Sequence, residues 1–222
     1  MKNSKNAVLA AALLALAPAV QAADYPTKAV RMVIAFTPGG PSDILSRLVG
    51  GKLAERMGQP FVFDNRPGAG GNVAGEIVAT SPADGYTLMI ANNAVLAANA
   101  SLYKKMTFNP AKDLVPVVWV ASQPNILVVH PSVPAKSLKD FVAYAKANPG
   151  RINYASAGNG SPLHLAAELF KARAGVNMVH VPYKGGGEVA VQLVGNHVDS
   201  TVNNPIEAIA QWRAGTLRPL CV

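Results

Sequence analysis

The sequence predicts an α/β protein in which two Rossmann-like units face each other across a hinged cleft. Strand-like apolar runs alternate with helix-like runs along most of the chain, and the alternation forms two series that meet near residues 118–125. Glycine-rich loops follow several of the strand-like runs. Alternating strands and helices imply parallel sheets with right-handed crossovers, and such sheets bind ligands beyond the carboxyl ends of their strands.

The N-terminal segment has the composition of a secretory signal. Lys2 and Lys5 precede an uncharged, alanine-rich apolar run over residues 7–19, and residues 20–22 (VQA) supply small side chains where a signal peptidase cleaves. The apolar run is short for a membrane span. We therefore expect residues 1–22 to be a cleaved signal peptide and the mature protein to reach the periplasm.

The first series predicts a βαβαβ unit. The run of residues 42–57 places apolar side chains, Leu45 and Leu48 among them, on one helical face, and Gly58 can end that helix. The predicted elements are strand 30–36, helix 42–57, strand 61–64, helix 73–80 and strand 87–91.

The second series begins near residue 115 with two long connecting strands, over residues 115–121 and 125–129. Ser137 and Ser161 each precede a helical pattern and are good N-caps, and Pro162 suits a first helical position. The remaining predicted elements are helix 138–147, strand 152–155, helix 162–174, strand 178–181, helix 188–194, strand 198–202, helix 205–214 and strand 217–222.

These series divide the mature chain into a first α/β domain over residues 23–121 and a second over residues 122–222. The chain stops on an apolar strand and has no C-terminal docking helix after it. We expect the sequence to be a fragment whose first domain is incomplete because its C-terminal part is missing.

Charge and cysteine content narrow the class of partner. The formal charge is +8, but the basic residues are scattered and aromatic residues are only 6% of the chain. Nucleic-acid readers usually concentrate their positive charge on one face, so we expect no nucleic-acid partner. A mildly basic field can attract anionic solutes, and it can equally serve solubility alone. The single cysteine, Cys221, lies in an apolar strand and is expected to be inert core.

Three glycine-rich loops lie between a predicted strand and a predicted helix. The loop at residues 37–43 and the loop at residues 156–164 can each present backbone N–H groups to an anion at a helix N-terminus. An ordinary turn with a capping residue explains the same residues without a ligand. The loop at residues 65–72 resembles a dinucleotide fingerprint, but Val73 stands where a small residue is needed, so we interpret it as a structural turn.

No catalytic, metal or cofactor motif is present in the sequence. The four histidines are dispersed, and Ser161 and His164 lie one helical turn apart without a Gly-x-Ser-x-Gly elbow. Metal-ligand spacings are absent. Asparagines at predicted strand ends (Asn92, Asn93, Asn203 and Asn204) favour neutral hydrogen-bonding walls, although each also suits a turn. We expect a binding protein without cofactor or metal, and not an enzyme.

Several short motifs together resemble the Bug family, the periplasmic receptors of tripartite tricarboxylate transporters. The resemblance covers essentially the whole mature chain, with the motifs in the family's order. The motifs are Tyr25-Pro26-Thr27-Lys28, Phe36 to Asp43 (FTPGGPSD), Gly58-Gln59-Pro60, Asn65 to Gly71 (NRPGAGG), Asp84 to Leu88 (DGYTL), Tyr144 to Gly150 (YAKANPG) and His180 to Gly185 (HVPYKG).

The resemblance implies a type II periplasmic binding protein, a two-domain Venus flytrap that binds a small organic acid through backbone N–H groups, hydroxyls and bridging waters. Asn203 stands where the family pattern has an acidic residue, which leaves recognition of a ligand amine open. The ligand-binding residues that the resemblance implies are Thr37, Gly39, Gly40, Asp43, Asn92, Asn93, Ser156, Gly158, Gly160, Ser161, His164, Lys184, Gly185 and Asn203.

The implied function is capture of a small carboxylate for uptake by inner-membrane transporter subunits, with the receptor acting as a monomer. A periplasmic sensor that feeds a membrane kinase is an alternative that the sequence does not separate from transport. A third hypothesis is an α/β hydrolase that uses Ser161 and His164. The family also extends further at the C-terminus, so we expect an uncovered sheet edge and reduced stability in the first domain.

Overall fold

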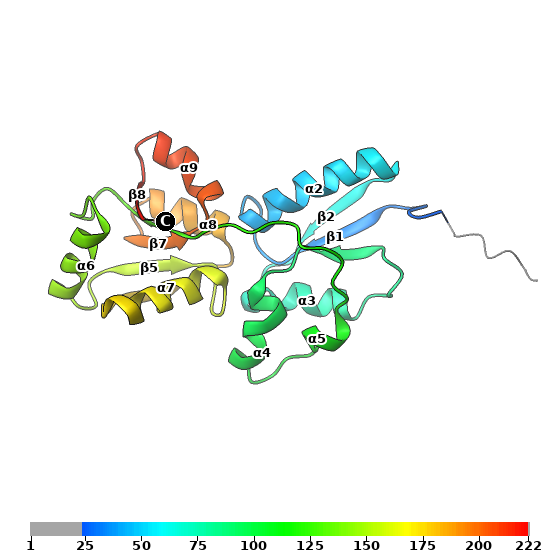
Figure 1. The fold of residues 1–222 in the computed structure, drawn as a ribbon, viewed down its shortest axis with the longest axis horizontal. Helices are drawn as coiled ribbons and strands as arrows, with labels where there is room; N and C mark the ends of the chain where they lie inside the picture. The colour runs from blue at the N-terminus through cyan, green and yellow to red at the C-terminus, as the bar shows by residue number, and fades with distance from the viewer. Residues whose placement is uncertain (1–23, 222) are drawn as a thin grey trace, which may run out of the picture.

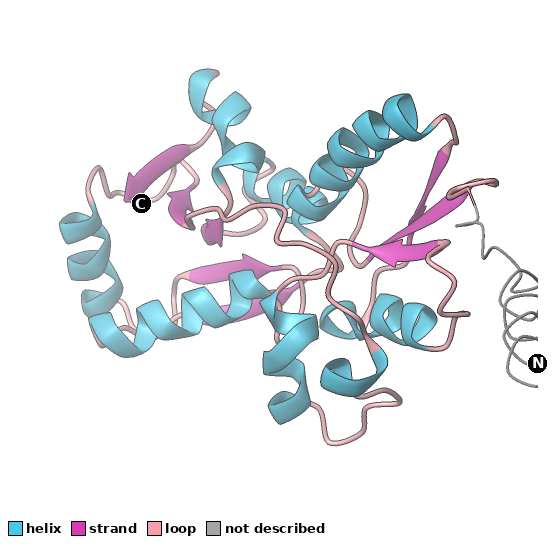
Figure 2. Cartoon of the chain, turned by 45° about the vertical axis from the view of Figure 1, so that its right-hand side comes forward, coloured by secondary structure: helices cyan, strands magenta, loops and turns pink. Residues whose placement is uncertain are grey.

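The computed structural model describes residues 24–221, which form two α/β lobes joined by an extended crossing segment (Figure 1). The first lobe contains the elements from β1 to α5, and the second contains those from β4 to β8. Figure 2 shows the lobes side by side from a second angle, each with its own sheet. The signal peptide expected over residues 1–22 lies outside the described residues. No helix in the described range is long and apolar enough to cross a membrane.

The first lobe is the βαβαβ unit that the sequence predicts. Its three strands are parallel in the order β2-β1-β3, and α2 and α3 lie on opposite sides of the sheet (Figure 1). Gly58 ends α2 in the left-handed conformation, as expected. The elements are β1 (Val30–Ile34), α2 (Pro41–Met57), β2 (Phe61–Asn65), η1 (Ala69–Gly71), α3 (Asn72–Ala79) and β3 (Thr87–Met89).

The apolar face predicted for α2 is only partly buried. Leu48 is 63% exposed, whereas Ser46 and Gly50 are buried against the sheet. A Cβ atom at Gly50 would lie 2.8 Å from the Phe63 ring, so only a glycine permits this close approach of helix and strand. Helix α2 therefore docks through its small residues, and part of its apolar face meets solvent.

Three short helices that follow β3 were not predicted. They are η2 (Ala94–Ala98), α4 (Asn99–Leu102) and α5 (Pro110–Asp113), and η2 has π-helical hydrogen bonds. Asn99 is fully buried, and its amide donates to the Gly70 carbonyl at 3.2 Å. This tertiary contact holds a segment whose alanine-rich sequence gives no helical periodicity.

The second lobe contains a five-stranded sheet in the order β6-β5-β7-β4-β8. β5 is parallel to β6 and β7, whereas β4 is antiparallel to β7 and β8. All four residues of β4 are buried, because helices cover both faces of the sheet. The elements are β4 (Ile126–Val129), α6 (Leu138–Ala147), β5 (Asn153–Ser156), α7 (Pro162–Ala174), β6 (Val179–Pro182), α8 (Gly186–Val194), β7 (Ser200–Asn203), α9 (Pro205–Arg213) and β8 (Arg218–Cys221).

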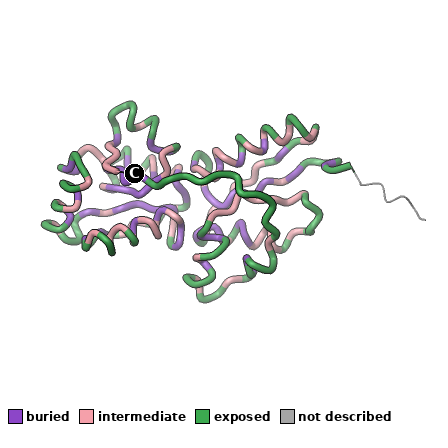
Figure 3. Tube along the Cα trace, in the orientation of Figure 1, coloured by how far each residue is buried: buried purple, intermediate pink, exposed green. Residues whose placement is uncertain are grey.

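The segment over residues 114–125 crosses between the lobes in an extended conformation. The strand predicted for residues 115–121 is wrong, because no described strand pairs with this segment. Most of this segment is exposed (Figure 3). Among its apolar side chains, Val115 is 85% exposed and Trp119 is 82% exposed. A β-prone sequence becomes a strand only where a neighbouring strand accepts its hydrogen bonds.

Candidate ligand-binding site between the lobes

The first loop of the site connects β1 to α2 at the edge of the first lobe. Gly39 has φ +81°, a conformation that favours glycine, and Gly40 is the N-cap of α2, with Pro41 at the first helical position. The Oγ1 atom of Thr37 is buried without a hydrogen-bond partner among the described residues. The first N–H groups of a helix have no intrahelical partner, so this loop offers donors to an anion.

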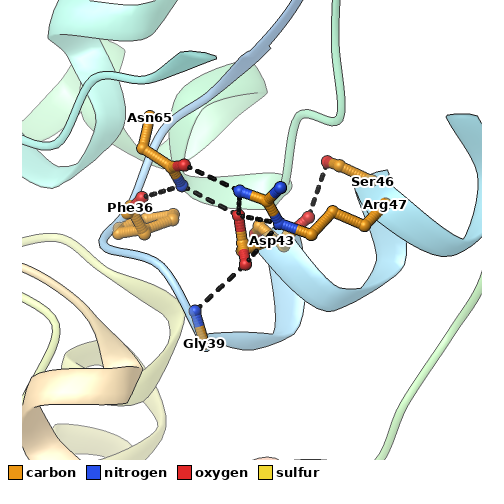
Figure 4. A network of polar contacts seen from close by, with 7 residues as sticks. Phe36, Gly39, Asp43, Ser46, Arg47 and Asn65 are labelled. Carbon is orange, nitrogen blue, oxygen red and sulfur yellow. Dashed lines mark hydrogen bonds and ion pairs between the residues drawn. The ribbon is translucent and has the colours of Figure 1, made fainter. Parts of the chain in front are cut away.

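Asp43 shapes this loop from within, although the sequence analysis assigned it to the ligand. Its carboxylate accepts from the Gly39 N–H at 3.1 Å and from the Asn65 amide at 3.0 Å, and it pairs with Arg47 (Figure 4). The Asn65 amide also donates to the Phe36 carbonyl at 3.0 Å. Burial alone would raise the pKa of Asp43, but bonds to Arg47, Gly39 and Asn65 hold it below its usual value. Asp43 is therefore occupied by internal partners.

Replacing Asp43 by asparagine is expected to lower the free energy of unfolding by about 1–3 kcal/mol at pH 7, because the new amide turns a donor towards other donors. The folded-state pKa of Asp43 lies below the unfolded value of about 4. Its stabilisation is therefore complete above that value and is lost as the pH falls through the folded-state pKa. Urea unfolding at several pH values measures this effect. The difference in free energy of unfolding between wild type and Asp43→Asn should become smaller at acid pH.

The matched control for this variant is Glu55→Gln on the same helix. Among the described residues, Glu55 forms an ion pair only with Lys52, and both side chains are exposed. Loss of such a surface pair changes stability by at most about 0.5 kcal/mol. If the stability difference between wild type and Asp43→Asn stays constant from neutral to acid pH, the ionised carboxylate of Asp43 does not stabilise the loop as proposed.

The second loop, residues 156–161, is held by hydrogen bonds within itself. Gly158 N–H donates to Ser156 Oγ at 3.1 Å, Gly160 N–H to His164 Nδ1 at 3.2 Å, and Ser161 N–H to the Gly158 carbonyl at 3.1 Å. Ser161 is the N-cap of α7, as predicted, and accepts from the His164 N–H at 3.3 Å. We expected these N–H groups to be free to bind an anion, and that expectation is wrong. The three donors already form hydrogen bonds to Ser156, His164 and Gly158.

A buried serine–histidine contact lies behind the second loop. Ser156 is fully buried, and its Oγ lies 2.6 Å from His180 Nε2. The His180 ring stacks on Tyr154 at 4.9 Å and lies 4.3 Å from the His164 ring. Burial, followed by the neighbouring His164, lowers the pKa of His180 to about 4, so the imidazole is neutral at pH 7. The His164 ring accepts a hydrogen bond from the Gly160 N–H through Nδ1. Its hydrogen bond to Ser161 Oγ comes from the backbone N–H of His164, not from the ring.

The third loop brings the second lobe against the first. Gly185 is the N-cap of α8, and a Cβ atom there would lie 2.6 Å from the Thr37 nitrogen. A Cβ atom at Gly187 would overlap the Pro38 carbonyl oxygen. Glycines at these positions let the two backbones meet directly, and the N-termini of α2 and α8 thereby converge.

A second contact between the lobes involves residues 156–161. Tyr103 donates its hydroxyl to the Asn159 carbonyl at 2.8 Å, and a Cβ atom at Gly160 would lie 2.6 Å from Asn99 Oδ1. The 156–161 loop therefore also contacts the first lobe. An apolar cluster joins Val33, Ala35, Phe36 and Ala74 of the first lobe to Ala157 and Leu163 of the second.

Glu207 lies at the junction and was missed by the sequence analysis. It is 6% exposed, and neither carboxyl oxygen has a hydrogen-bond partner among the described residues. Cβ atoms built on Gly186 and Gly40 would lie 2.7 Å from its Cδ and 3.3 Å from its Oε1. Burial raises the pKa of Glu207 to about 8. The nearby Asn203 amide acts to lower this pKa, but it makes no hydrogen bond to either carboxyl oxygen. The sequence feature that could have identified it is an acidic residue in the first turn of a helix that directly follows a strand.

The other residues assigned to the ligand have local roles. The Asn92 side chain caps two N–H groups of the helical segment that follows it, at 3.1 and 3.2 Å. Asn93 precedes η2 and makes no side-chain cap. Asn203 accepts from the next backbone N–H at 2.8 Å, and exposed Lys184 donates its backbone N–H to Glu188 at 3.0 Å. Within the described chain, no group of three potential ligands is placed to hold a metal ion.

Two α/β lobes whose strand-end loops meet across a junction have the fold of periplasmic binding proteins, which confirms the predicted fold class. Residues 45–222 match the model of the tripartite tricarboxylate transporter family receptors, TctC. The chain belongs to this family, as its motifs indicated.

Similar proteins support the assignment. Protein BugT of Bordetella pertussis is 38% identical over 208 residues, which are 93% of this chain and 64% of BugT. The chain thus spans just under two thirds of that relative's length. The structure of R. palustris Rpa4515 with adipate is 41% identical, has a TM-score of 0.86 and covers 89% of this chain and 66% of that chain. MatC (Rpa3494) from Rhodopseudomonas palustris, with bound malate, is 31% identical, with a TM-score of 0.83 and coverage of 88% and 66%.

Proposed function

We propose that this protein is a periplasmic receptor that captures a small dicarboxylate between its lobes. The observation that carries the proposal is the convergence of the α2 and α8 N-termini beside the buried Thr37 hydroxyl. Two helix N-termini supply unpaired N–H donors and a positive dipole end to a single anion. Family members with bound adipate and malate support a carboxylate as the ligand.

The ligand contacts in this proposal come from Thr37, Gly40 and Gly185. Asp43 and the residues of the 156–161 loop position those contacts. We propose that the two lobes are the domains expected over residues 23–121 and 122–222, and that they open to admit the ligand. A ligand that contacts both lobes only when they are closed shifts the equilibrium towards closure.

Binding without catalysis is supported by the arrangement of the serines and histidines. The Ser161 hydroxyl caps α7, and Ser156 is buried beneath its loop. Delivery of the captured solute to a membrane permease follows the family's description as transporter receptors. We place the receptor in the periplasm on the same ground, with residues 1–22 as its export signal.

Calorimetric unfolding of the purified protein tests this function. Adipate or malate at about 100 times its dissociation constant is expected to add roughly 2.7 kcal/mol to the free energy of unfolding. Hexanoate, which matches the six-carbon chain of adipate but has one carboxylate, is the control for a diacid site. A cooperative transition that no mono-, di- or tricarboxylate shifts would contradict the proposal.

A further inference from the structure

The carboxyl group of Glu207 is an unpaired buried acid at the point where the lobes meet. It lies in the first turn of α9 and packs against Gly40 at the start of α2 and Gly186 at the start of α8. The residue is 6% exposed, and neither oxygen has a hydrogen-bond partner among the described residues. Native proteins rarely leave a buried carboxyl group unsatisfied, so its position points to a partner that enters between the lobes.

The charged groups on the surrounding elements do not neutralise Glu207. In α2, Asp43 and Arg47 pair with each other. At the start of α8, Glu188 accepts from the backbone N–H of Lys184. No described lysine, arginine or histidine, Arg213 of α9 included, forms an ion pair with Glu207. The carboxyl group therefore has no cation that would hold it ionised beside a bound anion.

We propose that Glu207 determines specificity at this site by remaining protonated and donating its O–H to one carboxylate of the ligand. This inference rests on the function proposed above. Two ionised carboxylates in contact repel each other, whereas an acid and a carboxylate form a short, strong O–H···O⁻ bond. Burial, which raises the pKa of Glu207 to about 8, keeps the free acid neutral at pH 7, and contact with an anionic ligand raises it further.

The proposal predicts which solutes the site accepts. A protonated carboxyl group donates a hydrogen bond to an acceptor. It can therefore bind a carboxylate oxygen of a dicarboxylate such as adipate. An ammonium group at the same position requires the ionised form. We therefore expect adipate to bind more tightly than aspartate, in which an ammonium group accompanies the two carboxylates.

Isothermal titration calorimetry with adipate between pH 6 and 9.5 tests the proposal. Wild-type affinity should be constant near pH 6–7 and should fall up to about tenfold per pH unit above about 8, because Glu207 must take up a proton to bind. Titrations in two buffers of different protonation enthalpy measure the number of protons taken up on binding. Glu207→Gln keeps a donor, so its affinity should stay within a few-fold of wild type at pH 6–7 and show no loss at higher pH. Glu188→Gln, in the first turn of α8, is the matched control and should follow the wild-type profile.

A measurement without ligand separates this role from a structural one. The pKa of Glu207 is higher in the folded state than in the unfolded state, so the folded state binds the proton more tightly. Wild-type stability relative to Glu207→Gln should therefore fall as the pH rises from about 4 to about 8. A constant difference across that range would overturn the protonated assignment.

The possible failures are distinguishable. Adipate binding to wild type with a flat pH profile contradicts the role of Glu207 alone. Loss of binding in Glu207→Gln, with preference for aspartate over adipate, shows an ionised Glu207 that pairs with an ammonium group and also overturns the proposal. If neither adipate nor malate binds wild type at any pH, the receptor function fails and the Glu207 proposal fails with it.

Discussion

Replacing Gly185 by alanine should weaken dicarboxylate binding by between about fivefold and a hundredfold while both lobes remain folded. The backbone at Gly185 has φ 177°, which alanine adopts without strain. The new Cβ atom would lie 2.6 Å from the Thr37 nitrogen, and this backbone atom cannot rotate away as a side chain can. Overpacking of this kind costs about 1–3 kcal/mol, and each 1.4 kcal/mol changes affinity about tenfold.

Titration calorimetry with adipate measures this effect, and Gly51→Ala is the matched control. Gly51 lies within α2, and a Cβ atom there has nothing within 4 Å. The control should keep wild-type affinity and gain up to about 1 kcal/mol of stability, because alanine favours a helix interior. Wild-type affinity in Gly185→Ala would show that the ligand does not require the contact between the Thr37 and Gly185 loops.

Alanine at Gly160 should reduce both stability and binding. Gly160 has φ +78°, so alanine there carries about 1–2 kcal/mol of backbone strain. Its Cβ atom would also lie 2.6 Å from Asn99 Oδ1 and 3.2 Å from a methyl group of Leu102, both in the first lobe. Strain affects unfolding of the second lobe, whereas the contact with the first lobe opposes closure around a ligand.

Gly175→Ala separates these two effects, because it lies at the other end of α7 with φ +63° and nothing within 4 Å of a Cβ atom. Both variants should lose similar stability in urea unfolding. Only Gly160→Ala should lose adipate affinity, by about tenfold or more. Equal affinities in the two variants would mean that the contact of the 156–161 loop with Asn99 is not part of the closed, liganded state.

Much of the fold was predictable because its signals are local. Ser137 and Ser161 cap their helices through N–H groups three residues away, and Gly58 and Gly175 end theirs in the left-handed conformation. Such interactions lie within one helical turn, so the sequence contains all the partners. The parallel order of the first sheet follows equally from the alternation of strands and helices.

Elements that depend on distant partners were predicted poorly. The strand expected over residues 115–121 has no neighbour in the described sheets, and Leu48 on the predicted apolar face of α2 is exposed. Helix α4 is held by the amide of Asn99, which reaches the Gly70 carbonyl 29 residues away. Apolar periodicity shows that a face can be buried, but the shape of the opposing surface decides which face is buried.

For the site, the sequence by itself located the loops, because glycines between a strand and a helix mark a backbone that an anion can approach. It did not decide what each side chain does there. Asp43 bonds to Asn65, Ser156 meets His180, and Glu207 is buried by glycines of both lobes, through contacts between residues 21 to 167 positions apart. Burial and hydrogen bonding set the charge and availability of a side chain, and both arise only when distant segments pack together.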